Sequence, residues 1–387
     1  MSPDQALPAD AVQALEFAED GQITVRLEAV IHQAIRDAGG WLGFDQFMAL
    51  ALYQPDLGYY SNARQKFGLM PQSGSDFVTA PELSPLFGRA LAAQIAQALA
   101  VSGTRTVWEF GAGTGALAAQ LLDALGERVE RYCIVDLSGH LATRQAERLK
   151  PWADKVHWVQ QLPEGFEGVV VGNEVLDAMP VQLLSFDGKA WAERGVVTAT
   201  EPGVAFAFAD QPSPLHPPWP PQDAASQFPP GSVTEIHGQA EAFVRTLAAK
   251  LQRGAIFLLD YGFPEAEYYL PQRHGGTLMC HHLHRADTNP LVSVGQKDIT
   301  AHVNFTGIAL AGQEAGLCVL GYTSQANFLL NCGLAELMAA ASVPERSMAL
   351  RLMAEHEMGE LFKVIGFAVG EEFEAIGFAH GDRSHTL

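Results

Sequence analysis

The sequence contains few cysteines. Its 387 residues include only Cys133, Cys280, Cys318 and Cys332, and no two of them have the spacing CxxC. A disulfide-stapled domain or a structural zinc site needs paired cysteines, so the sequence favours neither. We expect reduced thiols in the core of a cytoplasmic protein.

Basic residues are also scarce. The chain has 24 Lys and Arg against 44 Asp and Glu, which gives a formal net charge of −20. A nucleic acid partner needs a basic surface, so this balance argues against DNA or RNA. An acidic surface would attract a segment that carries Arg or Lys, although the same charge could serve solubility alone.

Long apolar runs are absent. Even residues 86–101 are interrupted by Arg89, Gln94 and Gln97, so no membrane span is expected. Residues 1–4 show neither the basic start nor the amphipathic pattern of a targeting signal. We therefore expect no membrane partner and a cytoplasmic location.

The order of predicted elements indicates an α/β protein. Residues 1–103 are expected to be mainly helical, with Ser84 and Pro85 starting a helix that stops at Gly103. From residue 104 onward, short β-branched strands alternate with helices, which is typical of a parallel, doubly wound sheet.

This alternation divides the rest of the chain into three regions. Residues 104–180 are predicted to form the first half of the core. Residues 181–232 would be an inserted substrate region of antiparallel strands and a Pro-rich stretch. Residues 233–387 would complete the core, with a helical insert near 327–360.

A glycine-rich loop follows the predicted strand 106–110. Gly111, Gly113 and Gly115 let the backbone turn tightly and approach a ligand closely. Asp136 ends the next strand, where a carboxylate can accept both ribose hydroxyls of an adenosine. The loop also fits a dinucleotide pattern, so a nicotinamide cofactor and S-adenosylmethionine remain alternatives.

Three features favour S-adenosylmethionine. Glycine stands at every second position of the loop, and the loop comes after residues 1–103 rather than near the N-terminus. The loop also follows Glu109, whose carboxylate could face the positively charged methionine end of this cofactor.

Six motifs together make the chain similar to a known family. They lie at residues 57–60 with 75–84, 109–115, 135–138, 173–180, 260–262 and 298–305. In these segments the sequence resembles the MidA-like methyltransferase family from about residue 44 to about residue 330. It departs at Ser75, where the family usually has glycine, and at Asn304, which replaces a common aspartate.

The resemblance implies an α/β fold of the class I, Rossmann-like S-adenosylmethionine-dependent methyltransferases, with a seven-stranded, mostly parallel sheet. Mitochondrial members of this family assist respiratory complex I assembly by methylating an arginine of a subunit. The resemblance therefore implies a protein partner with an exposed arginine. It implies cofactor contacts from Thr79, Pro81, Glu82, Glu109, Gly111, Gly113, Gly115, Asp136 and Asn173.

Glu174 and Asp177 are the predicted catalytic residues. A guanidinium has a pKa above about 12, so at neutral pH its nitrogens are poor nucleophiles. Carboxylates can bind the guanidinium through paired hydrogen bonds and accept the proton that it releases. If a helical turn begins after the strand, both acids can face the same side. Alternatively, Asp177 caps the backbone and Glu174 is a solvated acid. Glu235 and Asp260 are further acidic candidates, with Asp260 expected to bond backbone amides.

Three other functions remain compatible with the sequence. They are a small-molecule N- or O-methyltransferase, a nicotinamide-dependent dehydrogenase, and an assembly factor that binds the cofactor without transfer. The cluster His281, His282 and His284 is too tightly spaced for one tetrahedral ion, so no metal is expected. The favoured prediction is a protein-arginine methyltransferase that acts on a complex I subunit or a related protein.

Overall fold

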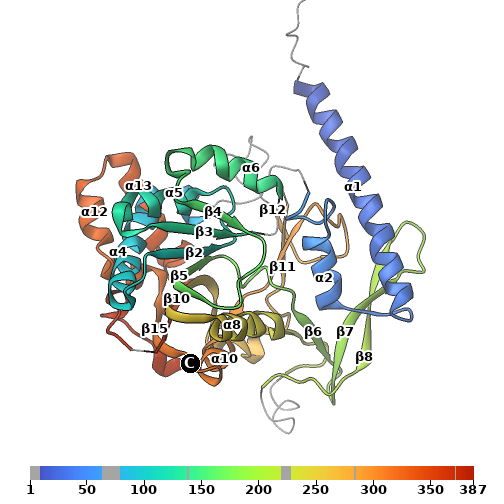
Figure 1. Cartoon of the computed structure of the whole chain (residues 1–387). Coiled ribbons are helices and arrows are strands. Elements are labelled where there is room, and N and C mark those ends of the chain that lie inside the picture. The colour runs from blue at the N-terminus through green and yellow to red at the C-terminus, as the bar shows by residue number, and fades with distance from the viewer. Residues whose placement is uncertain (1–8, 63–78, 137–138, 219–227, 283–284, 371) are drawn as a thin grey trace, which may run out of the picture.

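The computed structural model describes residues 9–62, 79–136, 139–218, 228–282, 285–370 and 372–387. Its central element is a sheet in which seven strands lie in the order β15-β16-β10-β5-β2-β3-β4, with β14 paired to β10 (Figure 1). These strands are β2 (Thr106–Phe110), β3 (Arg131–Val135), β4 (Val156–Val159), β5 (Phe166–Asn173), β10 (Leu251–Phe263), β14 (Val303–Asn304), β15 (Cys318–Ser324) and β16 (Phe362–Val369).

Strand direction in this sheet is mostly parallel. The strands β10, β5, β2, β3 and β4 pair with one another in parallel, whereas β16 is antiparallel to both of its neighbours. Parallel neighbours require crossover connections, which explains why helices follow β2 and β3 in the sequence. The predicted α/β fold with a seven-stranded, mostly parallel sheet is confirmed.

Two hydrophobic cores lie on the two faces of the sheet. Successive strand residues point to opposite faces, so Val107 and Val171 join one core while Trp108 and Val170 join the other. The helices α4 (Pro85–Ser102), α5 (Ala116–Leu125), α11 (Gln325–Asn331), α12 (Leu334–Ala340) and α13 (Val343–Met353) contribute to the first core. The helices α8 (Gly238–Lys250) and α10 (Phe305–Glu314) contribute to the second.

Helix α4 begins and ends where the sequence predicts. The Ser84 side chain caps it by accepting a hydrogen bond from the amide of Leu86, and Pro85 occupies the first turn. Gly103 ends the helix in the left-handed conformation, with φ of 62°, which glycine adopts at little cost.

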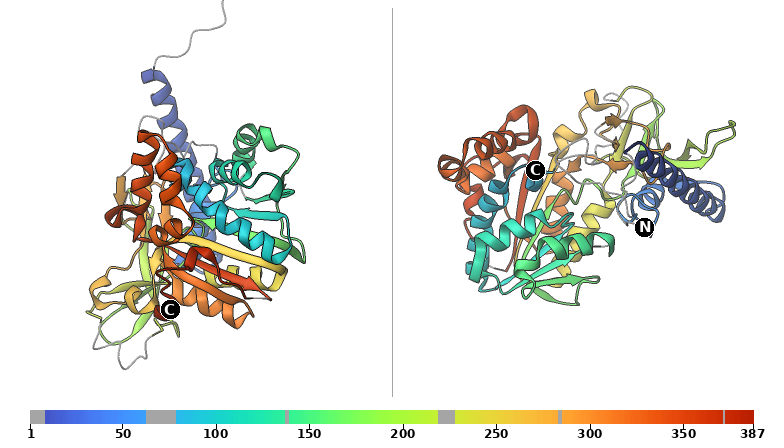
Figure 2. Two further views of the ribbon diagram at one scale, coloured as in Figure 1. Left: turned by 90° about the vertical axis from the view of Figure 1, so that its left-hand side faces the viewer. Right: turned by 90° about the horizontal axis from the view of Figure 1, so that it is seen from above.

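The N-terminal helices belong to a second layer of structure. Helix α1 (Ala9–Asp37) and helix α2 (Phe44–Tyr53) pack against a separate five-stranded sheet, and α1 projects beyond the body of the molecule (Figures 1 and 2). The strands of that sheet are β1 (Leu42–Gly43), β6 (Gln182–Phe186), β7 (Trp191–Thr198), β8 (Phe206–Pro212) and β9 (Val233–Ile236). The predicted antiparallel strands after residue 181 are present as β6, β7 and β8.

A small third sheet extends the second layer. It consists of β12 (Arg285–Asp287), β11 (Met279–His282) and β13 (Asp298–Thr300) in that order. Cys280 and Ile299 from this sheet are buried in the same core as α1 and α2. The remaining α-helices are α3 (Ala80–Leu83), α6 (Gly139–Arg148) and α9 (Glu265–Tyr268). Trp219 of the Pro-rich stretch and His284 lie outside the described residues.

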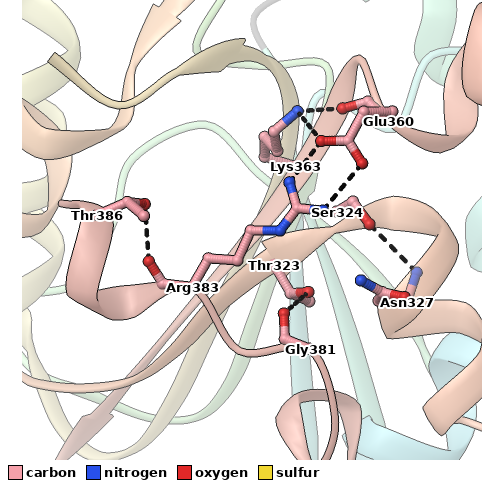
Figure 3. Close-up of polar contacts among 8 residues, drawn as sticks. All are labelled: Thr323, Ser324, Asn327, Glu360, Lys363, Gly381, Arg383 and Thr386. Atoms are coloured by element: carbon pink, nitrogen blue, oxygen red, sulfur yellow. Dashed lines mark hydrogen bonds and ion pairs between the residues drawn. The ribbon is translucent and has the colours of Figure 1, made fainter. Parts of the chain in front are cut away.

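The C-terminal segment is fastened to the sheet by polar contacts (Figure 3). The two terminal guanidinium nitrogens of Arg383, Nη1 and Nη2, donate to the Glu360 carboxylate at 2.5 and 3.1 Å. Lys363 in β16 lies 3.5 Å from the same carboxylate, and the Thr323 hydroxyl donates to the Gly381 carbonyl at 2.6 Å. The last residues are therefore held to strand β15 and to Glu360, which lies just before β16.

Two further findings concern the cysteines and the possibility of a membrane-spanning helix. All four cysteines are free, and Cys133, Cys280 and Cys332 are buried. None of the helices in the described ranges combines the length and the apolar character needed to cross a membrane.

Candidate active site

The glycine loop lies between β2 and α5. Gly111, Gly113 and Gly115 all have positive φ values, of 64°, 53° and 81°, which other residues rarely adopt. A Cβ atom at Gly111 would lie 3.1 Å from the Val175 side chain. Gly111 and Gly113 line a cavity of about 640 Å³, whereas Gly115 forms the N-cap of α5.

Asp136 lies at the adjacent strand end and is tied to this loop. It directly follows β3, and its Oδ2 accepts a hydrogen bond of 2.9 Å from Gln145 Nε2. The same amide group of Gln145 also donates to the Gly113 carbonyl, at 3.0 Å. Gln145 in α6 thus couples the acid to the loop, and nothing in its sequence context indicates this role.

The segment 79–82 covers the glycine loop. Thr79, Pro81 and Glu82 line the same cavity, as the resemblance implies for cofactor contacts. The Glu82 carboxylate accepts hydrogen bonds from the Thr114 hydroxyl and from Arg148, the latter at 2.7 Å. Ser75, at the start of this motif, lies outside the described residues.

Glu174 and Asp177 both line the cavity, but the expected helical turn is absent. The chain leaves β5 through Glu174, whose φ of 55° is left-handed, and continues as an irregular loop. Asp260 shapes this loop, because its Oδ2 accepts hydrogen bonds from the amides of Val175, Leu176 and Asp177 at 3.1, 2.8 and 3.2 Å. The prediction that Asp260 bonds backbone amides is confirmed.

Two buried polar atoms face this region without a partner. Oδ1 of Asn173 and Oδ1 of Asp177 make no hydrogen bond within the described part of the chain, although both residues are more than 90% buried. A buried polar atom without a partner is costly, and such atoms in a cavity wall indicate a polar ligand.

The cavity wall is strongly acidic. Among the described residues that line it, six are acids and none is Lys, Arg or His: the acids are Glu82, Glu109, Asp136, Glu174, Asp177 and Asp298. Burial raises the pKa of Glu109 to about 8 and that of Glu174 to about 8, and the neighbouring Asp177 adds repulsion at Glu174. Burial also raises the pKa of Asp177 to about 6. The wall therefore favours a ligand with positive charge.

Sequence reasoning missed the tyrosines of the site. Tyr53 in α2 and Tyr60 line the cavity, with their rings stacked at a centroid distance of 5.6 Å. The Tyr60 hydroxyl donates to Asp298 Oδ1 at 2.8 Å, and the Tyr261 hydroxyl donates to Asp177 Oδ2 at 2.5 Å. Tyr60, Tyr261 and Asp298 each belong to a motif noted in the sequence, which was the available signal.

Asn304 and Glu235 do not contribute to the cavity wall. Asn304 caps α10, since its side chain accepts a hydrogen bond from the Gly307 amide at 3.3 Å. An aspartate could cap this helix equally well, so the departure at this position does not remove an acid from the cavity. Glu235 is fully buried and accepts hydrogen bonds from Thr277, Leu278 and Tyr268.

The residues present fit an adenosyl cofactor with a cationic end. Gly111 and Gly113 line the cavity with backbone in the left-handed conformation, and a Cβ at Gly111 would crowd the Val175 side chain. Asp136 offers a carboxylate at the strand end next to this loop, and the acids Glu82 and Glu109 line the same cavity. Ligands of doubly wound sheets bind at this carboxyl edge of the strands.

A solved structure closely resembles this chain. It is a protein from Burkholderia thailandensis, bound to S-adenosyl-homocysteine, with 48% sequence identity and a TM-score of 0.90. The match covers 99% of this chain and 100% of that one. A second crystal structure from the same organism has 47% identity and a TM-score of 0.85 over the same shares.

Curated relatives are more distant. The chain is 24% identical to a Danio rerio protein named "Protein arginine methyltransferase NDUFAF7, mitochondrial", over 83% of this chain and 80% of the relative. It is 26% identical to the Drosophila melanogaster homolog of that name, over 94% and 89%.

These relatives contradict the predicted cytoplasmic location. Those of Danio rerio, Drosophila melanogaster, Caenorhabditis elegans and Xenopus tropicalis are all named as mitochondrial proteins. The prediction rested on the few unpaired cysteines, on the lack of long apolar runs and on the absence of a targeting pattern in residues 1–4, and none of these fixes the compartment in which a folded domain acts.

Residues 90–323, more than half of the chain, match a family described as S-adenosyl-L-methionine-dependent methyltransferases. The matched range includes the glycine loop, Asp136 and the acids after β5, and the solved relative holds the demethylated form of the cofactor. The predicted cofactor is therefore confirmed, and the chain belongs to this family of S-adenosyl-L-methionine-dependent methyltransferases.

Proposed function

We propose that this enzyme transfers a methyl group to an arginine side chain of a protein. The observation that carries the proposal is the set of three acids, Glu174, Asp177 and Asp298, in a cavity wall whose described residues include no Lys, Arg or His. The names of the curated relatives support the same substrate class. The assignment of the acceptor to a complex I subunit stays a prediction.

Methyl transfer to an arginine would bring two positive charges together in this cavity. When bound, the cofactor supplies an activated methyl group on a positively charged sulfonium. An arginine acceptor would bring a second positive charge, and two unit charges ~4 Å apart at an effective dielectric of ~20 repel by about 4 kcal/mol. A carboxylate at a similar distance offsets this repulsion. An arginine enzyme therefore needs acids beside the acceptor, whereas an enzyme for neutral acceptors does not.

Asp177 is suited to bind a guanidinium. Asp177 lines the cavity, Tyr261 fixes its Oδ2, and its buried Oδ1 has no hydrogen-bond partner among the described residues, so this oxygen could accept a hydrogen bond from an acceptor group. Charge-assisted hydrogen bonds to a carboxylate are short and strong, and they orient a planar guanidinium. Asp177 would thus hold one edge of the acceptor.

Glu174 is suited to receive a proton. Its raised pKa of about 8 lies near neutral pH, where a carboxylate is a more effective base than at its ordinary value. The Asn173 side chain donates to Glu174 Oε1 at 3.0 Å and orients it. We assign to Glu174 the proton that the guanidinium loses on methylation.

The residues predicted from the sequence would bind the cofactor in this reaction. Gly111 and Gly113 would allow close approach to the backbone, and Asp136 would accept the ribose hydroxyls. Thr79, Pro81 and Glu82 would cover the methionine end. Asn173 would lie between cofactor and acceptor, and the Glu109 carboxylate would face the positively charged methionine end.

A transfer assay tests the proposed function. The purified enzyme would be incubated with methyl-labelled cofactor and protein extract from cells that lack it, and labelled proteins would be analysed by mass spectrometry. Methylarginine in a discrete protein band supports the proposal. A label in a small molecule would favour the small-molecule alternative, and an enzyme that binds cofactor but labels nothing would favour an assembly factor.

A further inference from the structure

Tyr261 reaches the acidic loop because β10 extends beyond the end of its neighbour β5. The pairing between these parallel strands ends with Leu259 beside Asn173, whereas β10 continues past that point. Asp260 and Tyr261 therefore lie alongside the loop that follows β5. Asp260 accepts hydrogen bonds from three amides of this loop, and the Tyr261 hydroxyl donates to Asp177 Oδ2 at 2.5 Å. One residue fixes the backbone of the loop, and the other fixes a carboxylate that the loop carries.

The Tyr261 ring packs against two other rings. His302 contacts it edge to face, with ring centroids 5.0 Å apart, and Phe362 of β16 does the same at 5.3 Å. His302 is itself held, because its ring stacks on Phe263 at an interplanar angle of 3°. This packing leaves the tyrosine little freedom to turn its hydroxyl away from Asp177.

The surroundings of Asp177 favour its neutral form. The residue is 5% exposed, and burial raises its pKa from 3.8 to about 6. Among the described residues, the titratable groups that act on it electrostatically are acids and tyrosines: Glu174, Asp260, Tyr53, Tyr60 and Tyr261. Asp298 of β13 is a further acid in the cavity wall, to which no described Lys, Arg or His contributes. Burial lowers the pKa of His302 to about 4, so this ring is neutral near pH 7.

The hydrogen bond from Tyr261 works against this tendency. Of the influences on Asp177 that lower its pKa, this hydrogen bond is the largest. An ionised carboxylate accepts a hydrogen bond more strongly than a neutral carboxyl group does, so the bond favours the ionised form. Burial and the adjacent Asp177 raise the pKa of Tyr261 well above its ordinary value, so the tyrosine stays neutral and able to donate. It adds no positive charge that would compete with a guanidinium.

Resting on the proposed function, we infer that Tyr261 is a positioning residue for the reaction, which holds the Asp177 carboxylate ionised and in one orientation for the cationic acceptor. Tyr261 acts through Asp177 and need not touch the acceptor itself. The motif at residues 260–262 thus supports the acceptor side of the site twice, with Asp260 through the backbone of the loop and Tyr261 through a side chain.

Titration of Asp177 itself tests the inference without any acceptor. Enzyme labelled with carbon-13 at its Asp carboxyl groups would be followed by NMR from about pH 4 to about pH 9, and the Asp177 signal would be identified by its absence in Asp177→Asn. Tyr261→Phe should raise the midpoint of this signal by about one pH unit or more, the effect of losing a hydrogen bond to a charged group. The variant should keep the circular dichroism and the S-adenosyl-homocysteine affinity of the wild type.

Binding of an arginine probe tests the consequence for the acceptor. Enzyme saturated with S-adenosyl-homocysteine would be titrated with N-acetyl-arginine amide at about pH 6.5 and at about pH 8.5. At the lower pH, Tyr261→Phe should bind this probe at least about threefold more weakly than the wild type does. The difference should shrink at the higher pH, where Asp177 is ionised in both proteins. Glu174 titrates in both proteins, so a difference between them does not come from Glu174.

Two comparisons separate this role from a general loss of structure. Tyr269→Phe removes the hydroxyl of another buried tyrosine, which donates to the Glu235 carbonyl and lies outside the cavity wall. This variant should keep both the Asp177 midpoint and the probe binding of the wild type. In an Asp177→Asn background, Tyr261→Phe should cause no further loss of probe binding, whereas a structural role would cause the same loss in both backgrounds.

The outcomes distinguish this inference from the proposed function. An unchanged Asp177 midpoint in Tyr261→Phe would overturn the inference, even if the enzyme methylates arginine. A raised midpoint together with methyl transfer to a group other than arginine would contradict the proposed function, while the control of Asp177 by Tyr261 would stand. Equal losses of probe binding at both pH values and in both backgrounds would show that Tyr261 only supports the fold.

Discussion

Tyr261 donates a 2.5 Å hydrogen bond to Oδ2 of Asp177, while Oδ1 of the same carboxylate makes no hydrogen bond to the described part of the chain. One oxygen is thus fixed by the protein, while the other is buried without a hydrogen-bond partner in a residue that lines the cavity. The arrangement orients the carboxylate before any acceptor arrives, which lowers the ordering cost of binding.

The first prediction concerns the two acids after β5. Glu174→Gln and Asp177→Asn should each reduce methyl transfer at least tenfold, which corresponds to about 1.4 kcal/mol of barrier. The side-chain amides of these two variants keep the shape of the site, but they carry no negative charge to offset that of a guanidinium. Steady-state kinetics would measure the loss, and calorimetry should find nearly unchanged cofactor affinity. Full transfer by both variants would remove these acids from the mechanism.

The second prediction concerns pH. The pKa of Glu109 and that of Glu174 are each raised from 4.5 to about 8, so between these values the folded protein binds more protons than the unfolded chain. The free energy of unfolding of the cofactor-free enzyme should therefore fall as pH rises from about 4.5 to about 8, by up to roughly 1.4 kcal/mol per pH unit for each group.

Denaturant titrations at several pH values would measure this slope. Glu109→Gln and Glu174→Gln should each make it shallower, whereas Glu201→Gln, in an exposed turn, should not. Cofactor should stabilise the enzyme more at pH 8 than at pH 5, because its positive charge favours the ionised carboxylates. Stability that rises across this window would contradict the assignment.

The third prediction concerns the cofactor ribose. Asp136→Ala should weaken binding of S-adenosylmethionine by roughly 1.5–3 kcal/mol, the range for hydrogen bonds to a charged group. It would also leave the Gln145 amide without one of its two partners at this site. Calorimetry would measure the change, with the exposed Asp154→Ala as the charge-matched control. Equal affinity in both variants would place the ribose elsewhere.

The fourth prediction concerns the glycine loop. Gly113 has a φ of 53°, so a β-branched residue there is strained and its side chain enters the space beside the cavity. Gly113→Val should abolish cofactor binding while circular dichroism still reports a folded chain. Gly275→Val, at an open position without nearby atoms, should bind normally. Normal binding by Gly113→Val would show that the loop does not hold the cofactor.

Much of the fold could be predicted from local sequence pattern. The strand at 106–110 and the helix α4 have the bounds expected from the apolar runs and from the residues that start and stop a helix. The loop glycines and Asp136 were also predictable, since a strand end followed by glycines has a limited set of conformations. These features depend on residues close together in the chain.

Contacts between distant residues could not be predicted. Asp298 lies more than a hundred residues after Asp177, and the hydrogen bond from the Ala301 amide to the Asp177 carbonyl places the end of β13 beside the acidic loop. The left-handed backbone at Glu174 replaces the expected helical turn because Asp260 accepts hydrogen bonds from three backbone amides of that loop. The domain limits and the roles of the individual site residues stay predictions.

Identification of the methylated atom would decide whether this enzyme methylates arginine. Fragmentation mass spectrometry of the labelled protein, after incubation with enzyme and methyl-labelled S-adenosylmethionine, would locate the added group. We predict methylation on a guanidinium nitrogen of one arginine, strongly reduced with Glu174→Gln. A methyl group on a carboxylate, a hydroxyl or a metabolite would contradict arginine methylation.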